Sequence, residues 1–201
     1  RNSDYTIREY ICNFIMSKLE ANQVDPATGT TLTLGTSGDT ITIPSGVTIA
    51  NSGTATGFGD MTPAFSATLG TTQTIGTSTV TKLNINTEVF DTDGNFDTST
   101  YRFTPTTAGK YLFLAQIRIE GTGANQNARI KKNGTDVAFS IAANSASTQE
   151  TSNIMVCLDM NGSSDYVELY AEQNTGSNKQ VYGDSSNAGS TTFTGFKIIG
   201  A

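Results

Sequence analysis

Apolar and polar residues alternate along most of the chain after residue 64, which is the pattern of half-buried β-strands. The clearest example is the stretch 96–113, where two alternating segments flank a short connection. Because a proline donates no ladder hydrogen bond and a glycine frees the backbone, the connection fixes where one strand stops and the next begins. The positions that define it are Phe103, Pro105, Gly109, Tyr111 and Phe113.

The same alternation places the other strands of a C-terminal domain over residues 64–201. An Asn133-Gly134 pair lies between two alternating segments and predicts a two-residue hairpin, since both residues tolerate positive φ angles. Lys131 and Lys132 then lie at a hairpin end, where a solvated turn is favoured over a basic patch. We expect strands at about 64–70, 80–90, 98–104, 110–120, 126–132, 135–141, 152–160, 164–173 and 191–200.

A different period marks the N-terminus, where apolar residues recur every three or four positions. Ser3 and Asp4 are suited to cap a helix that runs to about Asn22. Its apolar stripe has no second helix in the chain to cover it, so we expect residues 1–24 to dock on another protein or to trimerise; packing on the chain's own β domain is the alternative. The stripe consists of Ile7, Tyr10, Ile11, Phe14, Ile15 and Leu19.

Between these regions, residues 25–63 are small and polar, with three short apolar pairs. Each pair puts two apolar side chains on one face of an extended segment, which is too few to build a core in one chain. Three chains wound around an axis would bury them, so we expect a thin trimeric β stalk; a disordered linker is the alternative. The pairs are Leu32 and Leu34, Ile41 and Ile43, and Val47 and Ile49.

Composition supports a mostly β protein, because the chain is rich in Thr, Ser, Asn and Gly and only 15% of its residues are charged. A net charge of −6 disfavours binding to nucleic acid. Cys12 and Cys157 form no disulfide framework, which suggests assembly in a reducing compartment. Charges at Arg8, Glu9 and Lys18 interrupt the apolar N-terminal stretch, so we expect neither membrane insertion nor a signal peptide.

Catalytic chemistry has little support in the sequence. The absence of histidine removes the Ser-His-Asp and Cys-His systems and the commonest transition-metal ligand. The Gly183-Asp184-Ser185 tripeptide is similar to the opening of a GDS-type esterase block, but it lacks the histidine partner that such a block needs. No spacing selects a glycosidase pair among Glu150, Asp159, Asp165, Glu168 and Glu172. We therefore expect no catalytic residue, no enzyme activity and no cofactor.

The sequence evidence for metal binding and for glycosylation is similarly weak. Acidic and amide residues at alternate positions from Asp91 to Asp97 are similar to a calcium loop, but the glycine stands at 94 and the twelfth position is Arg102. A turn before a strand is the favoured interpretation, and we assign no metal ligand. The sequons at Asn133 and Asn161 are better explained as turns.

Several motifs resemble one family in the correct order. The pattern F-T-P-x-x-x-G-x-Y-x-F follows Asn95-Phe96-Asp97, and it precedes Lys132-Asn133-Gly134, Val167-Glu168-Leu169 and Phe193-Thr194-Gly195-Phe196. Together they resemble the globular head of the complement subcomponent-q and tumour-necrosis-factor-like superfamily. The resemblance covers residues 64–201 and implies an antiparallel jelly-roll sandwich that forms a homotrimer. Some members bind calcium near the trimer apex, but the resemblance assigns no ligands here.

The expected stalk also resembles part of a known group of proteins. Residues 31–59 resemble segments of bacteriophage fibre proteins, in which strands from three chains form a slender prism. The sequence of this segment is TLTLGTSGDTITIPSGVTIANSGTATGFG. This similarity implies a virion protein that is assembled in the host cytoplasm.

Loops at the far end of the head are the expected binding region. If successive strands alternate direction, the connections 121–125, 142–149 and 174–190 point away from the stalk. The last connection is long and rich in Asn, Ser and Gly, and long loops on a rigid scaffold commonly bind partners. The receptor-binding candidates are Asn174, Lys179, Gln180, Tyr182, Asn144 and Asn125.

These features together predict a non-enzymatic trimeric fibre of a bacteriophage, which is anchored by its N-terminal helix and presents its head to a host-surface glycan or protein. A capsid-decorating or tail adaptor protein is the main alternative. A polysaccharide depolymerase tip and a secreted cytokine-like ligand are less favoured.

Overall fold

The computed structural model describes residues 24, 26, 28–52, 61–121, 125–142, 149–184 and 191–198. The chain divides into two compact units, Arg1–Gly53 and Thr54–Ala201. The predicted N-terminal helix, with its docking residues Ile7, Tyr10, Ile11, Phe14, Ile15 and Leu19, lies outside the described residues. No described residue is helical, and the described part of the chain contains no helix with the length and apolarity to cross a membrane.

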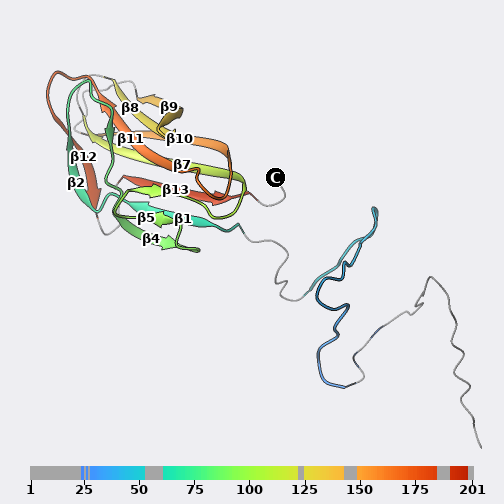
Figure 1. Cartoon of the computed structure of the whole chain (residues 1–201). Coiled ribbons are helices and arrows are strands. Elements are labelled where there is room, and N and C mark those ends of the chain that lie inside the picture. Colours follow the sequence, from blue (N-terminus) through green and yellow to red (C-terminus); the bar gives the residue numbers. More distant parts are fainter. Residues whose placement is uncertain are drawn as a thin grey trace, which may run out of the picture. The chain divides into compact units, whose positions relative to one another are not determined.

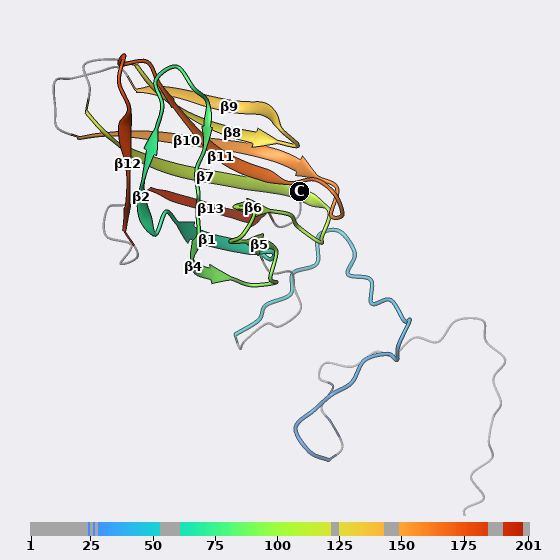
Figure 2. The same cartoon turned by 60° about the vertical axis from the view of Figure 1, so that its left-hand side comes forward.

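Two antiparallel sheets form the second unit and pack face to face as a sandwich (Figures 1 and 2). Sheet A has the order β2-β12-β7-β13-β1-β4, and β10 pairs with the opposite edge of β7. Its strands are β2 (Thr71–Ile75), β12 (Lys179–Asp184), β7 (Gly109–Glu120), β13 (Thr192–Lys197), β1 (Ala64–Thr68), β4 (Thr87–Asp91) and β10 (Gln149–Met160).

Sheet B has the order β5-β6-β11-β8-β9, and β3 also pairs with β11. Its strands are β5 (Phe96–Asp97), β6 (Arg102–Phe103), β11 (Val167–Gln173), β8 (Gln126–Lys132), β9 (Thr135–Ala142) and β3 (Thr81–Lys82). The expectation of a mostly β, antiparallel jelly-roll sandwich is therefore confirmed for the head.

Aromatic rings from both sheets fill the centre of the sandwich. The Phe65 ring stacks on Phe103 at 4.4 Å and on Phe96 at 4.8 Å, and Phe193 meets it edge-on at 5.1 Å. Burial of each ring stabilises the fold by about 1.5–3 kcal/mol. The fold-motif residues Phe103, Tyr111, Phe113 and Phe193 are fully buried, Pro105 is also buried, and Phe196 is half-buried.

Three other motif positions, Asn133, Gly134 and Gly195, have a structural reason for their residue type. Asn133 and Gly134 both have positive φ angles, of 51° and 80°, and form the tight turn between β8 and β9 that the sequence predicts. At Gly195 a β-carbon would lie 2.5 Å from Cδ1 of Phe113. A glycine at this position therefore lets β13 pass directly over the aromatic core.

The strand expected at 98–104 is confirmed only in part, because it forms as β6 at Arg102–Phe103 alone. Residues 98–101 form a turn between β5 and β6, and the carboxylate of Asp97 accepts bonds from the backbone N–H of Ser99 at 2.8 Å and the hydroxyl of Thr100 at 2.7 Å. Local side-chain bonds of this kind compete with a strand ladder. The segment 80–90 likewise separates into β3 and β4.

The connection expected at 174–190 is also wrong in part, because it contains β12, which pairs with β2 and β7. The strand β2 has the polar sequence TTQTI and carries no clear alternation. The alternation of apolar and polar residues therefore does not predict the polar edge strand β2 or its partner β12.

Strand registers place the strand ends Glu120, Gln126, Ala142, Gln149 and Gln173 at one end of the sandwich. Ala64, where the chain enters the domain, pairs with Phe196 near the opposite end, while Glu120 pairs with Gln149 and Gln173 with Gln126. We call the end of the sandwich that carries these strand ends the distal end. Strand parity thus predicts the common location of these strand ends, although the third connection, expected at 174–190, gives way to β12 at Lys179.

In the first unit, residues 28–52 contain turns but no strand. The backbone N–H groups of Asp39 and Val47 donate to the carbonyls of Thr36 and Pro44 and close two of these turns. The apolar pairs are exposed in the single chain, from 43% at Leu32 to 63% at Leu34. The trimeric stalk remains a prediction.

Candidate functional site

The outer face of sheet A carries an exposed apolar surface. Along β10 and β7 alternate side chains point away from the core, because successive residues of a strand face opposite sides. Met155 is 67% exposed, Leu114 beside it is 36% exposed, and Cys157 is also exposed. Leu112 and Phe196 are half-buried on the same face. We call this surface the sheet A face.

Cross-strand registers arrange the sheet A face in rows. Cys157, Leu112 and Phe196 form an apolar row, and the next row toward the distal end contains Met155 and Leu114. Polar side chains follow, and the central part of the face is hollowed by a shallow depression of about 540 Å³. The lining residues are Leu114, Ala115, Gln116, Asn153, Ile154, Met155, Thr192 and Thr194.

Exposed apolar residues also lie at both edges of the sandwich. At one edge β9 of sheet B exposes 62% of Phe139 and 54% of Ile141, and at the other β4 of sheet A exposes 48% of Val89 and of Phe90. Exposed apolar surface that gathers in patches often marks an interface between proteins. The sequence signal for the sheet A face is the segment from Ile154 to Leu158, which has apolar residues on both faces of β10.

The receptor-binding candidates lie near the distal end, but not as one loop. Asn125 and Asn174 are exposed in connections, and Asn144 lies outside the described residues. Lys179, Gln180 and Tyr182 instead belong to β12. Their position on a paired strand makes them more rigid than the loop residues that we expected.

Internal contacts already occupy the β12 candidates. The Lys179 Nζ lies 3.6 Å from Oε1 of Glu120, and the backbone N–H of Gln180 donates to Oε2 of the same residue at 3.3 Å. The Arg118 guanidinium lies 5.6 Å from the centre of the Tyr182 ring. These side chains therefore join β12 to the end of β7.

One buried glutamine holds the neighbouring distal loops in place. Gln173 is fully buried; its Oε1 accepts from the N–H of Thr175 at 2.8 Å, and its Nε2 donates to the carbonyl of Ser177 at 2.9 Å. The N–H of Gly176 donates to Oγ1 of Thr77 at 2.9 Å. The loops 174–178 and 76–79 are thus preorganised.

The calcium-like residues serve as local backbone acceptors. Asp91 accepts from the N–H of Phe96 at 2.7 Å, and Asn95 bonds the N–H of Thr106 at 2.7 Å. Side-chain bonds from Ser99 and Thr100 hold the pKa of Asp97 well below its ordinary value. Within the described residues, no group of three or more acidic or cysteine side chains is arranged to hold a metal ion.

The acidic residues considered for glycoside hydrolysis serve mostly as ion-pair partners at separate places. Asp159 pairs with Lys110 and Asp165 with Lys132, while Glu168 pairs with Lys82 and Arg102. Gly183 and Asp184 end β12, and Ser185 lies outside the described residues.

Comparisons with known proteins agree with this architecture. Residues 64–198 match the C1q domain family. The globular domain of zebrafish complement 1qA is similar at a TM-score of 0.50 and 22% identity, covering 68% of this chain and 97% of that one.

Two further solved structures have the same fold. Murine APRIL at pH 5.0 matches with a TM-score of 0.52 and 10% identity over 67% of this chain and 99% of that one. The Eiger TNF of S. frugiperda matches with a TM-score of 0.52 and 9% identity over 69% and 93%. No curated protein matches the chain.

Proposed function

Because residues 64–198 make this chain a member of the C1q domain family, we propose that its head is a non-enzymatic binding module that works as a homotrimer. Domains of this family are typically binding modules and commonly trimeric. The observation that carries the proposal is the sheet A face with Met155 and Leu114. A monomer would leave this face in water, whereas two further copies would cover it.

The apolar residues suggest how the copies meet. A closed ring of three needs two different patches that fit each other, since each contact in such a ring is heterologous. The edge formed by β9 and β10 offers Phe139 and Ile141 as one patch, and the sheet A face is the other. Full burial of a side chain such as Met155 or Phe139 contributes about 1.5–3 kcal/mol.

We further propose that the trimer is a bacteriophage virion fibre, assembled in the host cytoplasm. Residues 1–24 would dock on another virion protein, residues 25–63 would form the stalk, and the head would bind a host-surface glycan or protein. The exposed pairs of residues 28–52 support the stalk, because three chains would bury them together. Three heads on one particle site would multiply weak contacts by avidity.

Recognition of the host is proposed for the distal end. Asn125 and Asn174 are exposed there, and Gln173 preorganises the adjacent loops, which reduces the entropy lost on binding. Tyr182, Lys179 and Gln180 would contribute from β12.

Sedimentation equilibrium of the full chain tests the trimer. We expect a mass three times the 21.2 kDa of one chain. The substitution Met155→Glu should raise the concentration at which the trimer dissociates, whereas Val80→Glu, at an apolar residue 38% exposed elsewhere, should not. A monomer at every concentration would contradict the proposal.

The role on the particle needs a separate experiment, because a capsid-decorating or tail adaptor protein would share the same trimer. Electron microscopy of particles labelled with an antibody against the head distinguishes these roles. Label at the tail favours a role in host adsorption or a role as a tail adaptor. If the same antibody also blocks adsorption of the particle to the host, the adsorption role is favoured over the adaptor role. Label over the capsid faces favours decoration.

A further inference from the structure

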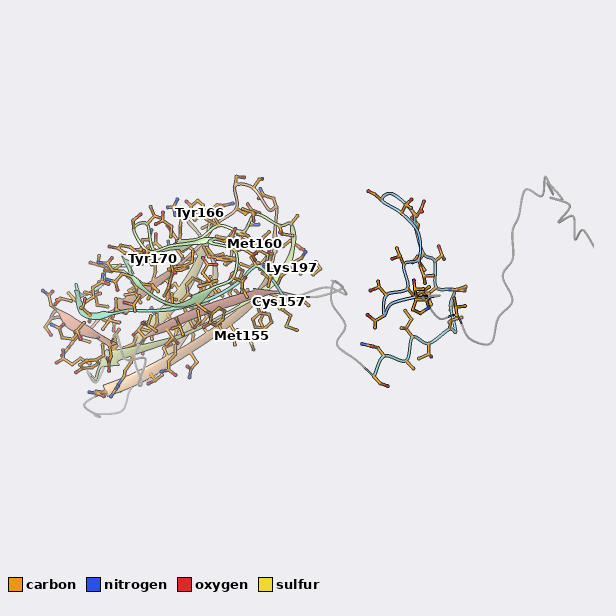
Figure 3. The ribbon with its side chains drawn as sticks, turned by 90° about the horizontal axis from the view of Figure 1, so that it is seen from below. Met155, Cys157, Met160, Tyr166, Tyr170 and Lys197 are labelled. Carbon is orange, nitrogen blue, oxygen red and sulfur yellow. The ribbon has the colours of Figure 1, made fainter. Side chains whose placement is uncertain are left out.

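Around β3, β6 and β11, the outer face of sheet B carries a charged and aromatic surface, and β8 separates it from Phe139 and Ile141, the β9 residues of the proposed trimer contact. Figure 3 shows Tyr166 and Tyr170 on the side of the domain opposite Met155. Because β8 lies between this surface and β9, and the sheet A face lies on the other side of the sandwich, a partner bound here need not displace a neighbouring copy.

At the centre of this surface two cations converge on one buried carboxylate. Glu168 on β11 is 3% exposed, and its Oε1 lies 2.5 Å from Nζ of Lys82 and 2.7 Å from Nη2 of Arg102. The Arg102 Nε also donates to this oxygen, at 3.1 Å. Two positive charges thus meet the buried carboxylate of Glu168, and the carboxylate of Asp97 on β5, which is directly opposite Arg102, lies on the same face.

Both cations keep donors that no contact within the described residues uses. Lys82 and Arg102 are 27% and 34% exposed, and the bonds to Glu168 involve only Nε and Nη2 of the guanidinium. An ammonium group has three donors and a guanidinium has five. The remaining N–H groups are therefore available to an anion at the surface.

Tyrosine rings surround this pair of cations. The Arg102 guanidinium lies 4.0 Å from the centre of the Tyr166 ring, and Lys82 lies 5.9 Å from that of Tyr101. Tyr170 donates its hydroxyl to Oε2 of Glu168 at 2.9 Å, and its ring lies 5.0 Å from Lys131. All three tyrosines are half-buried, so each ring is held in place while part of it stays at the surface.

Strand pairing fixes the positions of these groups. Glu168 is directly opposite Arg102 on β6 and Lys131 on β8, while Tyr170 is opposite Lys82. Groups on paired strands lose little conformational freedom when a ligand binds. The surface is therefore preorganised.

We propose that this surface binds an acidic saccharide, with the ligand's carboxylate on Lys82 and Arg102 and a sugar ring against Tyr166. Arginine and lysine are suited to carboxylates, and tyrosine combines an apolar ring with a hydroxyl. A polyacidic peptide is disfavoured because Glu168 and Asp97 counter the two cations, and the described part of sheet B has no extended row of unpaired cations. This inference does not depend on the virion role or on the trimer.

Binding of the full chain to soluble alginate, a uronate polymer, tests the proposal by calorimetry or biolayer interferometry at physiological salt. Dextran serves as the neutral saccharide and poly-glutamate as the acidic peptide. We expect alginate alone to bind. Lys82→Gln and Tyr166→Leu should each weaken it about tenfold, through loss of a charged contact or of the ring surface. Lys110→Gln, which removes a cation elsewhere, should leave it unchanged.

Tyr166→Leu keeps the ion pairs of Glu168, so a loss of binding in this variant is not explained by loss of those pairs. Thermal unfolding of each variant checks that it is folded. Absence of alginate binding overturns the proposal, as does equal weakening by Lys110→Gln. Equal binding of dextran overturns the role of the carboxylate. Stronger binding of poly-glutamate overturns the assignment to a saccharide.

Discussion

Gly195 shows how strongly a single residue constrains the head. Its backbone passes so close to the Phe113 ring that a β-carbon would lie 2.5 Å from Cδ1, and a β-carbon would also lie 2.8 Å from the Phe65 ring. Both rings are fully buried, so neither has free space into which to move. The closing strand therefore depends on glycine at this position.

We expect Gly195→Ala to lower the free energy of unfolding by about 1–3 kcal/mol, the usual cost of overpacking a core. Gly76→Ala is the matched control, because its β-carbon would meet Oγ1 of Thr79 at an ordinary 3.5 Å and its φ angle is not positive. Urea unfolding of both variants measures the difference. Equal stability of the two would contradict the described packing.

The carboxylates of sheet B make stability depend on pH. Burial raises the pKa of Glu168, but bonds from Lys82, Arg102 and Tyr170 outweigh it and leave this pKa below its ordinary value of 4.5. The bond from Arg129 lowers the pKa of Glu172 in the same way. Groups with depressed pKa values stabilise the fold above the unfolded pKa, and this contribution is lost as the pH falls through the folded pKa.

Stability should therefore stay nearly constant from pH 7 to about pH 5 and fall progressively below about pH 4.5. Glu168→Gln should reduce this dependence, because the residue no longer titrates. Asp159→Asn is the control, since Asp159 is 79% exposed in its pair with Lys110 and solvent screens such pairs. Urea midpoints at several pH values provide the measurement, and an unchanged pH profile for Glu168→Gln would refute the account.

At the scale of elements, the predictable strands are those with one buried and one exposed face. The strands β7, β8 and β9 lie within a residue or two of their expected bounds, since alternation and the Asn133-Gly134 turn both define them. The alternation does not predict β2 and β12, because their residues are mostly polar and their pairing depends on distant partners. It predicts a strand over 98–104, of which only β6 forms, because the Asp97 carboxylate holds residues 98–101 in a turn.

The candidate sites differ in the same way in how far the sequence predicts them. The distal location of the connections was predictable from strand parity. The Lys82, Arg102 and Glu168 cluster was not, because its members are 20 to 86 residues apart and meet only through the pairing of β3, β6 and β11.

We expect Gln173 to control the order of the distal loops. Gln173→Leu should speed hydrogen exchange in residues 174–178 while the exchange of β7 stays slow, because the side chain bonds Thr175 and Ser177. Gln126→Leu is the matched control, since Gln126 is equally buried at the same end but donates to Glu120. Exchange in 174–178 that is unaffected by Gln173→Leu would show that the loop does not depend on this residue.

At the scale of the whole molecule, the head offers two faces with different chemistry. The sheet A face is apolar around Met155, while sheet B is charged and aromatic around Glu168. This separation allows one face to join copies of the chain and leaves the other open to a ligand. The central claim is that copies of the head cover the sheet A face.

Labelling of Cys157 with a maleimide tests this claim most directly, because the exposed thiol lies in the apolar row beside Leu112. Peptide-resolved mass spectrometry of the full chain distinguishes it from Cys12. We expect slow labelling of Cys157 in the native protein and rapid labelling in Met155→Glu, with Val80→Glu as the unchanged control. Rapid labelling of Cys157 in the native protein, at concentrations where sedimentation finds a trimer, would show that the sheet A face is not the interface.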